Sequence, residues 1–136
     1  MESTVSPHPL RILAVDDHRD TAETMAMLLR LWGYEVLYVL SAAAVLREAA
    51  RFCPDLMLID LAMPEIDGYD LVRRLRQEEP FMHTPMVALT GFGDEVHRRQ
   101  AFEAGFDEIL LKPYPAANLK QLVEKLGLVR GGSKFG

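Results

Sequence analysis

Four separate segments of this sequence end in polar residues whose chemistry fits together: Asp16 and Asp17, Asp60, Thr90, and Lys112. Two carboxylates held 4 Å apart repel by about 4 kcal/mol at an effective dielectric near 20, and a divalent cation relieves that repulsion. Oxygen ligands select hard cations such as Mg²⁺. An aspartate that attacks phosphorus forms an acyl phosphate. The set therefore predicts phosphoryl transfer in which Mg²⁺ and Lys112 neutralise charge and the Thr90 hydroxyl bonds a phosphoryl oxygen.

Each of these residues, taken alone, has an ordinary structural explanation. An aspartate after a strand is usually a turn or cap residue, and we expect Asp20 to be such a cap. A threonine such as Thr90 is a common strand residue, and a lysine such as Lys112 usually lies on the surface. The functional interpretation depends on their joint position, because the carboxyl ends of parallel strands share one edge where ligands bind.

Short apolar runs alternate with amphipathic segments, a pattern typical of βα repeats around a parallel sheet. Residues 10–15, 34–39, 55–60, 85–90 and 108–111 are the predicted strands, and 20–32, 41–52, 69–77, 94–104 and 115–127 the predicted helices. Asp20 and Glu23 have the spacing of a capping box, and Gly33 is expected to end the first helix. We expect one domain over residues 10–127, between a flexible N-terminus, 1–9, and a flexible C-terminal tail, 128–136.

Composition narrows the class of protein. The net charge of −5 argues against direct nucleic-acid binding, which usually needs a basic face. No apolar run approaches the roughly 20 residues needed to span a bilayer, and the polar, proline-containing N-terminus is not a signal peptide. The single cysteine, Cys53, excludes an internal disulfide and fits a cytoplasmic location. We expect Cys53 to be a partly buried apolar residue.

Five segments together resemble a known family. They are Ile-Leu-Ala-Val-Asp-Asp at 12–17, Leu-Ile-Asp-Leu-Ala-Met-Pro-Glu-Ile-Asp-Gly at 58–68, Val-Ala-Leu-Thr-Gly at 87–91, Glu-Ala-Gly-Phe-Asp at 103–107 and Leu-Lys-Pro at 111–113. In this order and spacing the chain resembles the receiver domain of two-component response regulators, including the chemotaxis regulator and receivers of hybrid histidine kinases. The resemblance implies a flavodoxin-like α/β fold, (βα)5, with a doubly wound, five-stranded parallel sheet of strand order 2-1-3-4-5.

The resemblance also implies a metal site for Mg²⁺. Asp60 matches the phosphoacceptor, which is also a metal ligand, and Asp17 matches a direct ligand. Asp16 matches the acidic partner that acts largely through water. Ala62 matches the position whose backbone carbonyl completes the metal shell.

The remaining matches concern the phosphoryl group and the partners. Thr90 matches the switch hydroxyl and Lys112 the phosphate-pairing lysine, whose bond to Pro113 is commonly cis in this family. The implied donor is the phosphohistidine of a sensor histidine kinase or histidine phosphotransfer domain. The implied target surface comprises residues 94–127, where Phe102 and Tyr114 are candidate contacts. We expect a self-phosphorylating switch, not an enzyme with an external substrate, that is a monomer or weak dimer.

Three positions depart from common family patterns. Ile109 stands where an aromatic residue or histidine often rotates with the switch threonine, and we interpret it as an ordinary strand residue. Ala62 and Phe92 flank the phosphorylation site, where polar residues can position a hydrolytic water. We therefore hypothesise slow autodephosphorylation. We expect His18 to be a solvated loop residue.

Alternatives to a phosphorylated switch remain open. An aspartyl-phosphate phosphatase carries two aspartates separated by one residue after its first strand, whereas Asp16 and Asp17 are adjacent. A flavin or dinucleotide module needs a phosphate-binding loop, and the acidic, glycine-free residues 16–20 would repel phosphate. A scaffold that is never phosphorylated is disfavoured, because the acidic pair, the acceptor Asp60, Thr90 and Lys112 are all present. The sequence is compatible with a single-domain regulator, which its start and lack of an effector favour, and with a receiver excised from a larger protein such as a hybrid kinase.

Overall fold

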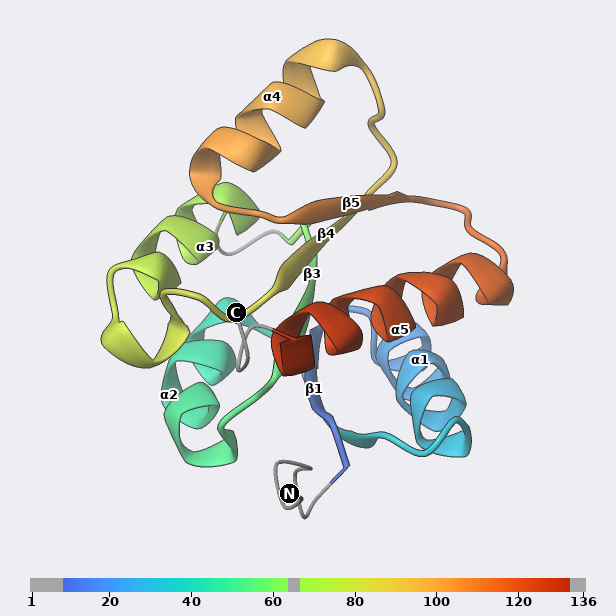
Figure 1. The fold of residues 1–136 in the computed structure, drawn as a ribbon. Helices are drawn as coiled ribbons and strands as arrows, with labels where there is room; N and C mark the ends of the chain where they lie inside the picture. Colours follow the sequence, from blue (N-terminus) through green and yellow to red (C-terminus); the bar gives the residue numbers. More distant parts are fainter. Residues whose placement is uncertain (1–8, 64–66, 133–136) are drawn as a thin grey trace.

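The computed structural model describes residues 9–63 and 67–132, with side chains described as far as residue 127. Its elements follow the order β1 (Arg11–Val15), α1 (Arg19–Leu31), β2 (Glu35–Val39), α2 (Ala42–Phe52), β3 (Leu56–Asp60), α3 (Gly68–Arg76), the 3₁₀ turn η2 (Glu79–Phe81), β4 (Met86–Thr90), α4 (Glu95–Ala104), β5 (Glu108–Leu111) and α5 (Ala116–Gly132). The strands form one parallel sheet of order β2-β1-β3-β4-β5 (Figure 1). The predicted fold class and strand order are confirmed.

Helices cover both faces of the sheet. In Figure 1, α1 and α5 lie on one side of the central strands, and α2, α3 and α4 lie on the other. Successive residues of β1 alternate between these two layers, as the pleat of a strand requires. Ile12 and Ala14 pack with residues of α1 and α5, whereas Leu13 and Val15 pack with residues of α2 and α3. All five residues of β3 and of β4 are buried, so the middle of the sheet is a rigid base for the residues that follow its strands.

The start of α1 differs from the prediction. Asp20 is not the N-cap; His18 holds that position without a side-chain capping bond, and Asp20 lies in the first turn. The Asp16 carboxylate accepts a hydrogen bond of 2.9 Å from the His18 N–H, which brings the chain into the helix earlier than the capping pattern indicated. In the first turn, the negative charge of Asp20 still interacts favourably with the positive end of the α1 helix dipole. The other predicted end is confirmed, since Gly33 follows the helix with a φ of +99°.

The end of α5 also differs. The helix does not stop near Gly127 but continues to Gly132, so the predicted tail, 128–136, begins as helix. A glycine inside a helix costs only about 1 kcal/mol relative to alanine, which is too little to end the helix by itself. Residues 1–8 of the predicted N-terminal segment and 133–136 of the tail lie outside the described residues. Cys53 was wrongly expected to be partly buried: it is exposed, at a φ of 56° after α2.

Backbone hydrogen bonds align the carboxyl ends of the strands. The Asp16 N–H donates to Val39 O at 3.2 Å, and the Lys112 N–H donates to Thr90 O at 2.8 Å. The α3 N-terminus lies close to the same edge, because a Cβ on Gly68 would be 2.7 Å from Leu61 Cδ2. The edge therefore holds four chain segments in fixed register. In the part of the chain that the structure describes, no helix is long and apolar enough to cross a membrane.

Candidate functional site

Asp60 is the buried centre of the polar group at this edge. It is the last residue of β3, and its side chain is 2% exposed. Its Oδ2 accepts a hydrogen bond of 2.7 Å from Lys112 Nζ, and its Oδ1 accepts one of 2.9 Å from the Ala62 N–H. A buried carboxylate needs such partners to remain charged. This ion pair joins two residues that are 52 positions apart in the sequence.

Asp16 lies beside Asp60 and is equally buried. Burial raises the pKa of Asp16 above its usual value of 3.8, and the negative charge of Asp60 raises it further, while the His18 N–H and the charge of Lys112 oppose these effects. Asp16 Oδ2 and Asp17 Oδ1 are both buried and have no hydrogen-bond partner among the described residues. Buried oxygens without donors are unfavourable unless a cation meets them. The donor set, carboxylate oxygens at a strand end, fits a hard divalent cation such as Mg²⁺.

Thr90 ends β4 and is buried at the same edge. Its hydroxyl oxygen accepts a hydrogen bond of 3.0 Å from the Phe92 N–H, which leaves the hydroxyl proton free to donate to a bound group. The Phe92 ring is 59% exposed and stacks on the His97 ring with centroids 4.7 Å apart. The stack and the 2.6 Å contact of His97 Nδ1 with Asp94 Oδ1 hold the Phe92 ring in the turn that follows Thr90.

The structure also places the other predicted residues. Ala62 lies two residues after Asp60, and its backbone is held there by the bond from its N–H to the Asp60 carboxylate. The Lys112–Pro113 peptide bond is cis, as predicted. Ile109 is half-buried against the core between the sheet and α2–α4, which agrees with its interpretation as an ordinary strand residue.

Two neighbours of the site were not assigned to it from the sequence. His18 is exposed, as expected, but its Nδ1 lies 3.2 Å from Asp17 Oδ1 and 3.4 Å from Asp16 Oδ1. Tyr114 is close enough that the charges of Asp16 and Asp60 add to the effect of burial in raising its pKa above the usual 10.0. For His18, the sequence signal for a place near the site was its position next to the acidic pair. For Tyr114 there was no such signal in the sequence, because its position depends on the path of the chain after β5.

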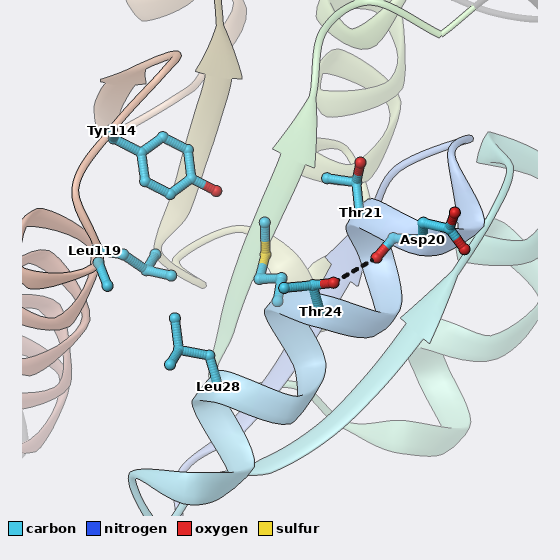
Figure 2. Close-up of a pocket in the computed structure, with 8 residues that line it drawn as sticks. Asp20, Thr21, Thr24, Leu28, Tyr114 and Leu119 are labelled. Carbon is cyan, nitrogen blue, oxygen red and sulfur yellow. Dashed lines mark hydrogen bonds between the residues drawn. The ribbon is translucent and has the colours of Figure 1, made fainter.

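A groove of about 360 Å³ opens next to the site, between α1 and the start of α5. It is lined by Asp20, Thr21, Thr24, Met25, Leu28, Tyr114, Ala116 and Leu119. Figure 2 shows Tyr114 extending from the segment before α5 toward α1, above Leu119 and Leu28. The groove was not predicted, because it arises from the packing of two helices far apart in sequence.

Fold and site together define a doubly wound α/β protein with an acidic cluster at the carboxyl edge of its sheet, and comparison with known proteins identifies the family. The family model of the response regulator receiver domain matches residues 12–124. An uncharacterised 14.6 kDa protein of Leptolyngbya boryana is 35% identical over 114 residues, which are 84% of this chain and 87% of that protein. The chain belongs to the response regulator receiver family of two-component signalling.

Solved structures agree with this assignment. A response regulator from Chloroflexus aurantiacus superposes with a TM-score of 0.81 at 35% identity, covering 87% of this chain and 97% of that one. The receiver domain of a sensor histidine kinase from Pseudomonas aeruginosa, with a magnesium ion in its active-site cleft, gives 0.79 at 30% identity, covering 88% and 98%. The chain spans only about half of two transcriptional regulators that it matches, RpaA of Synechocystis (48%) and PhoB of Pseudomonas aeruginosa (52%).

Proposed function

We propose that Asp60 accepts a phosphoryl group from the phosphohistidine of a sensor histidine kinase or histidine phosphotransfer domain, in a reaction that requires Mg²⁺. The observation that carries this proposal is the buried Asp60 carboxylate, 2.7 Å from Lys112 Nζ, beside Asp16 Oδ2, which is buried and has no hydrogen-bond partner among the described residues. Other arrangements of these residues, such as a cap or a surface ion pair, would not leave buried oxygens without donors.

The residues of the chain have distinct roles in this reaction. A carboxylate oxygen of Asp60 forms the new P–O bond while the P–N bond of the donor breaks and the imidazole leaves with the electron pair. Lys112 neutralises charge on the phosphoryl oxygens, and the Thr90 hydroxyl donates to one of them. Asp16, Asp17, Asp60 and the Ala62 carbonyl would hold Mg²⁺, which neutralises negative charge on the transferred group when bound.

The readout is a change of the surface formed by α4, β5 and α5. Exposed apolar side chains gather there: Phe92 in the turn before α4, Val96 at the start of α4, Phe102 near its end, and Leu111 on β5. The β4–α4 turn, held through Thr90, connects this surface to the site. In this proposal a protein target binds there, the chain acts as a monomer or weak dimer in the cytoplasm, and it has no external substrate.

Intact-protein mass spectrometry with acetyl phosphate tests the proposal. We expect a gain of one phosphoryl group that requires Mg²⁺ and is lost in Asp60→Asn. Asp70→Asn is the matched control, because Asp70 is an exposed aspartate of α3 paired with Arg73, and it should be phosphorylated normally. An adduct that persists in Asp60→Asn would contradict the assignment. Absence of any adduct in the native protein would favour an unphosphorylated scaffold.

A further inference from the structure

His18 lies beside the acidic pair in a geometry that a metal ligand would have. Its Nδ1 is 3.2 Å from Asp17 Oδ1 and 3.4 Å from Asp16 Oδ1, and ligand atoms of all three residues lie within 4.8 Å of one another. Neighbouring ligands of an octahedral ion, each about 2.1 Å from it, lie about 3.0 Å apart. The imidazole nitrogen and the Asp17 oxygen therefore have nearly the separation of two ligands on one ion.

The backbone fixes this position of His18. Its N–H donates to Asp16 Oδ1 at 2.9 Å, and its φ and ψ of −93° and 110° place it as the N-cap of α1. The ring itself is 74% exposed, so it can turn toward an ion without leaving a packed environment. The Asp16 side chain, by contrast, is 2% exposed, and its Oδ2 has no partner within the described ranges. The site thus combines the buried Asp16 Oδ2, which has no hydrogen-bond partner among the described residues, with His18 Nδ1 on an exposed ring that can rotate.

We propose that His18 Nδ1 is an additional metal ligand, which makes this site a mixed nitrogen and oxygen site that favours first-row transition ions over Mg²⁺. The proposal rests on the metal site of the proposed function and specifies its selectivity. Carboxylate and carbonyl oxygens suit Mg²⁺, whereas imidazole strengthens binding of Ni²⁺, Zn²⁺ and related ions. His18 therefore adds affinity for the transition ions and none for Mg²⁺.

Direct detection of the nitrogen is the sharpest test. Electron spin-echo spectroscopy of the protein loaded with Mn²⁺ should show coupling to a ¹⁴N nucleus in the native protein and no such coupling in His18→Ala. The matched control is His83→Ala, since His83 is an exposed histidine in the turn before β4, at the opposite edge of the sheet. That variant should retain the coupling.

Calorimetric titration with Ni²⁺ and with Mg²⁺ measures the metal selectivity of the site. We expect Ni²⁺ affinity to fall about tenfold in His18→Ala and in His18→Gln, while Mg²⁺ affinity stays unchanged in both. Two variants are used so that a change in packing can be distinguished from loss of the nitrogen. Mn²⁺ that binds without ¹⁴N coupling, or Mg²⁺ affinity that rises in His18→Ala, would overturn the inference and leave the proposed function intact. Absence of any metal binding sensitive to Asp17→Asn would instead overturn the proposed magnesium site itself.

Discussion

At the scale of a single residue, Asp16 is destabilised by its burial and by the like charge of Asp60. Its carboxylate is buried against Asp60, one of its oxygens has no donor among the described residues, and its pKa is raised mainly by burial. A carboxyl group whose pKa is raised by folding lowers stability as pH rises above its usual value of 3.8, and the loss is complete once pH passes the raised value. Ionisation of Asp16 therefore lowers the free energy of unfolding of the metal-free protein at neutral pH.

Asp16→Asn should raise the free energy of unfolding of the metal-free protein by about 1 kcal/mol at pH 7, because an amide removes the like charge and donates toward Asp60. At pH 3.5, below the usual pKa of 3.8, Asp16 is mostly protonated in both states, so the gain should shrink. Urea denaturation at the two pH values measures it. Asp20→Asn, on the exposed first turn of α1, is the control. A loss of stability at pH 7 would contradict the account.

At the same scale, we expect Ala62 and Phe92 to set the lifetime of the phosphorylated state. Neither side chain can position a water molecule for attack on the acyl phosphate, and Phe92 is held by stacking on His97. We expect a slow loss of the phosphoryl group, and Ala62→Asn should shorten the lifetime several-fold. Ala62→Val, which adds bulk without polarity, should not. Time-resolved intact mass after removal of the donor measures both, and a native lifetime of seconds would contradict the expectation.

At the scale of elements, Arg76 ties the end of α3 to two turns on the far side of the site. Its guanidinium donates to the carbonyls of Gly105 and Phe81, at 3.0 Å and 2.8 Å, and to Thr84 O at 2.7 Å. It also pairs with Asp107 Oδ2, which accepts from the Met86 N–H at the start of β4. Gly105 has a φ of +127°, and a Cβ there would be 2.9 Å from Arg76 Cγ, so the turn fits only glycine.

Arg76→Ala should lower the free energy of unfolding by about 2–4 kcal/mol, because several part-buried carbonyls lose their donor. Arg73→Ala is the matched control: it lies on the same helix but only pairs with exposed Asp70, and it should cost less than about 0.5 kcal/mol. Urea denaturation followed by circular dichroism compares the two. Equal losses in both variants would show that the Arg76 network contributes nothing specific.

Elements and site residues differed in how far the sequence could predict them. Strands such as β3 and the site aspartates were predictable because apolar runs and the residues that end them are local signals. The start of α1 depended on the Asp16 carboxylate bonding the His18 N–H, and α5 continues past Gly127 because a single glycine is a weak stop signal. The Arg76 network joins residues about 30 positions apart, which no local pattern reports.

At the scale of the whole molecule, we expect metal binding and folding to be coupled through one edge of the sheet. Residues from β1, β3, β4 and β5 meet there only in the folded chain, so an ion that binds the edge stabilises the native state. Mg²⁺ at about 100 times its dissociation constant should raise the free energy of unfolding by about 2.7 kcal/mol. Asp17→Asn should lose most of this gain, and Asp70→Asn should keep it. Equal stabilisation of both variants would indicate nonspecific binding.

Asp60 is the side chain that we propose to carry the phosphoryl group. Borohydride reduction of the protein treated with acetyl phosphate and Mg²⁺, followed by peptide sequencing in the mass spectrometer, tests it directly, because borohydride converts an aspartyl phosphate to homoserine. We predict homoserine at position 60 alone, and none when Mg²⁺ is withheld. Homoserine at position 16 or 17, or at no position in a protein that has gained a phosphoryl group, would contradict the account.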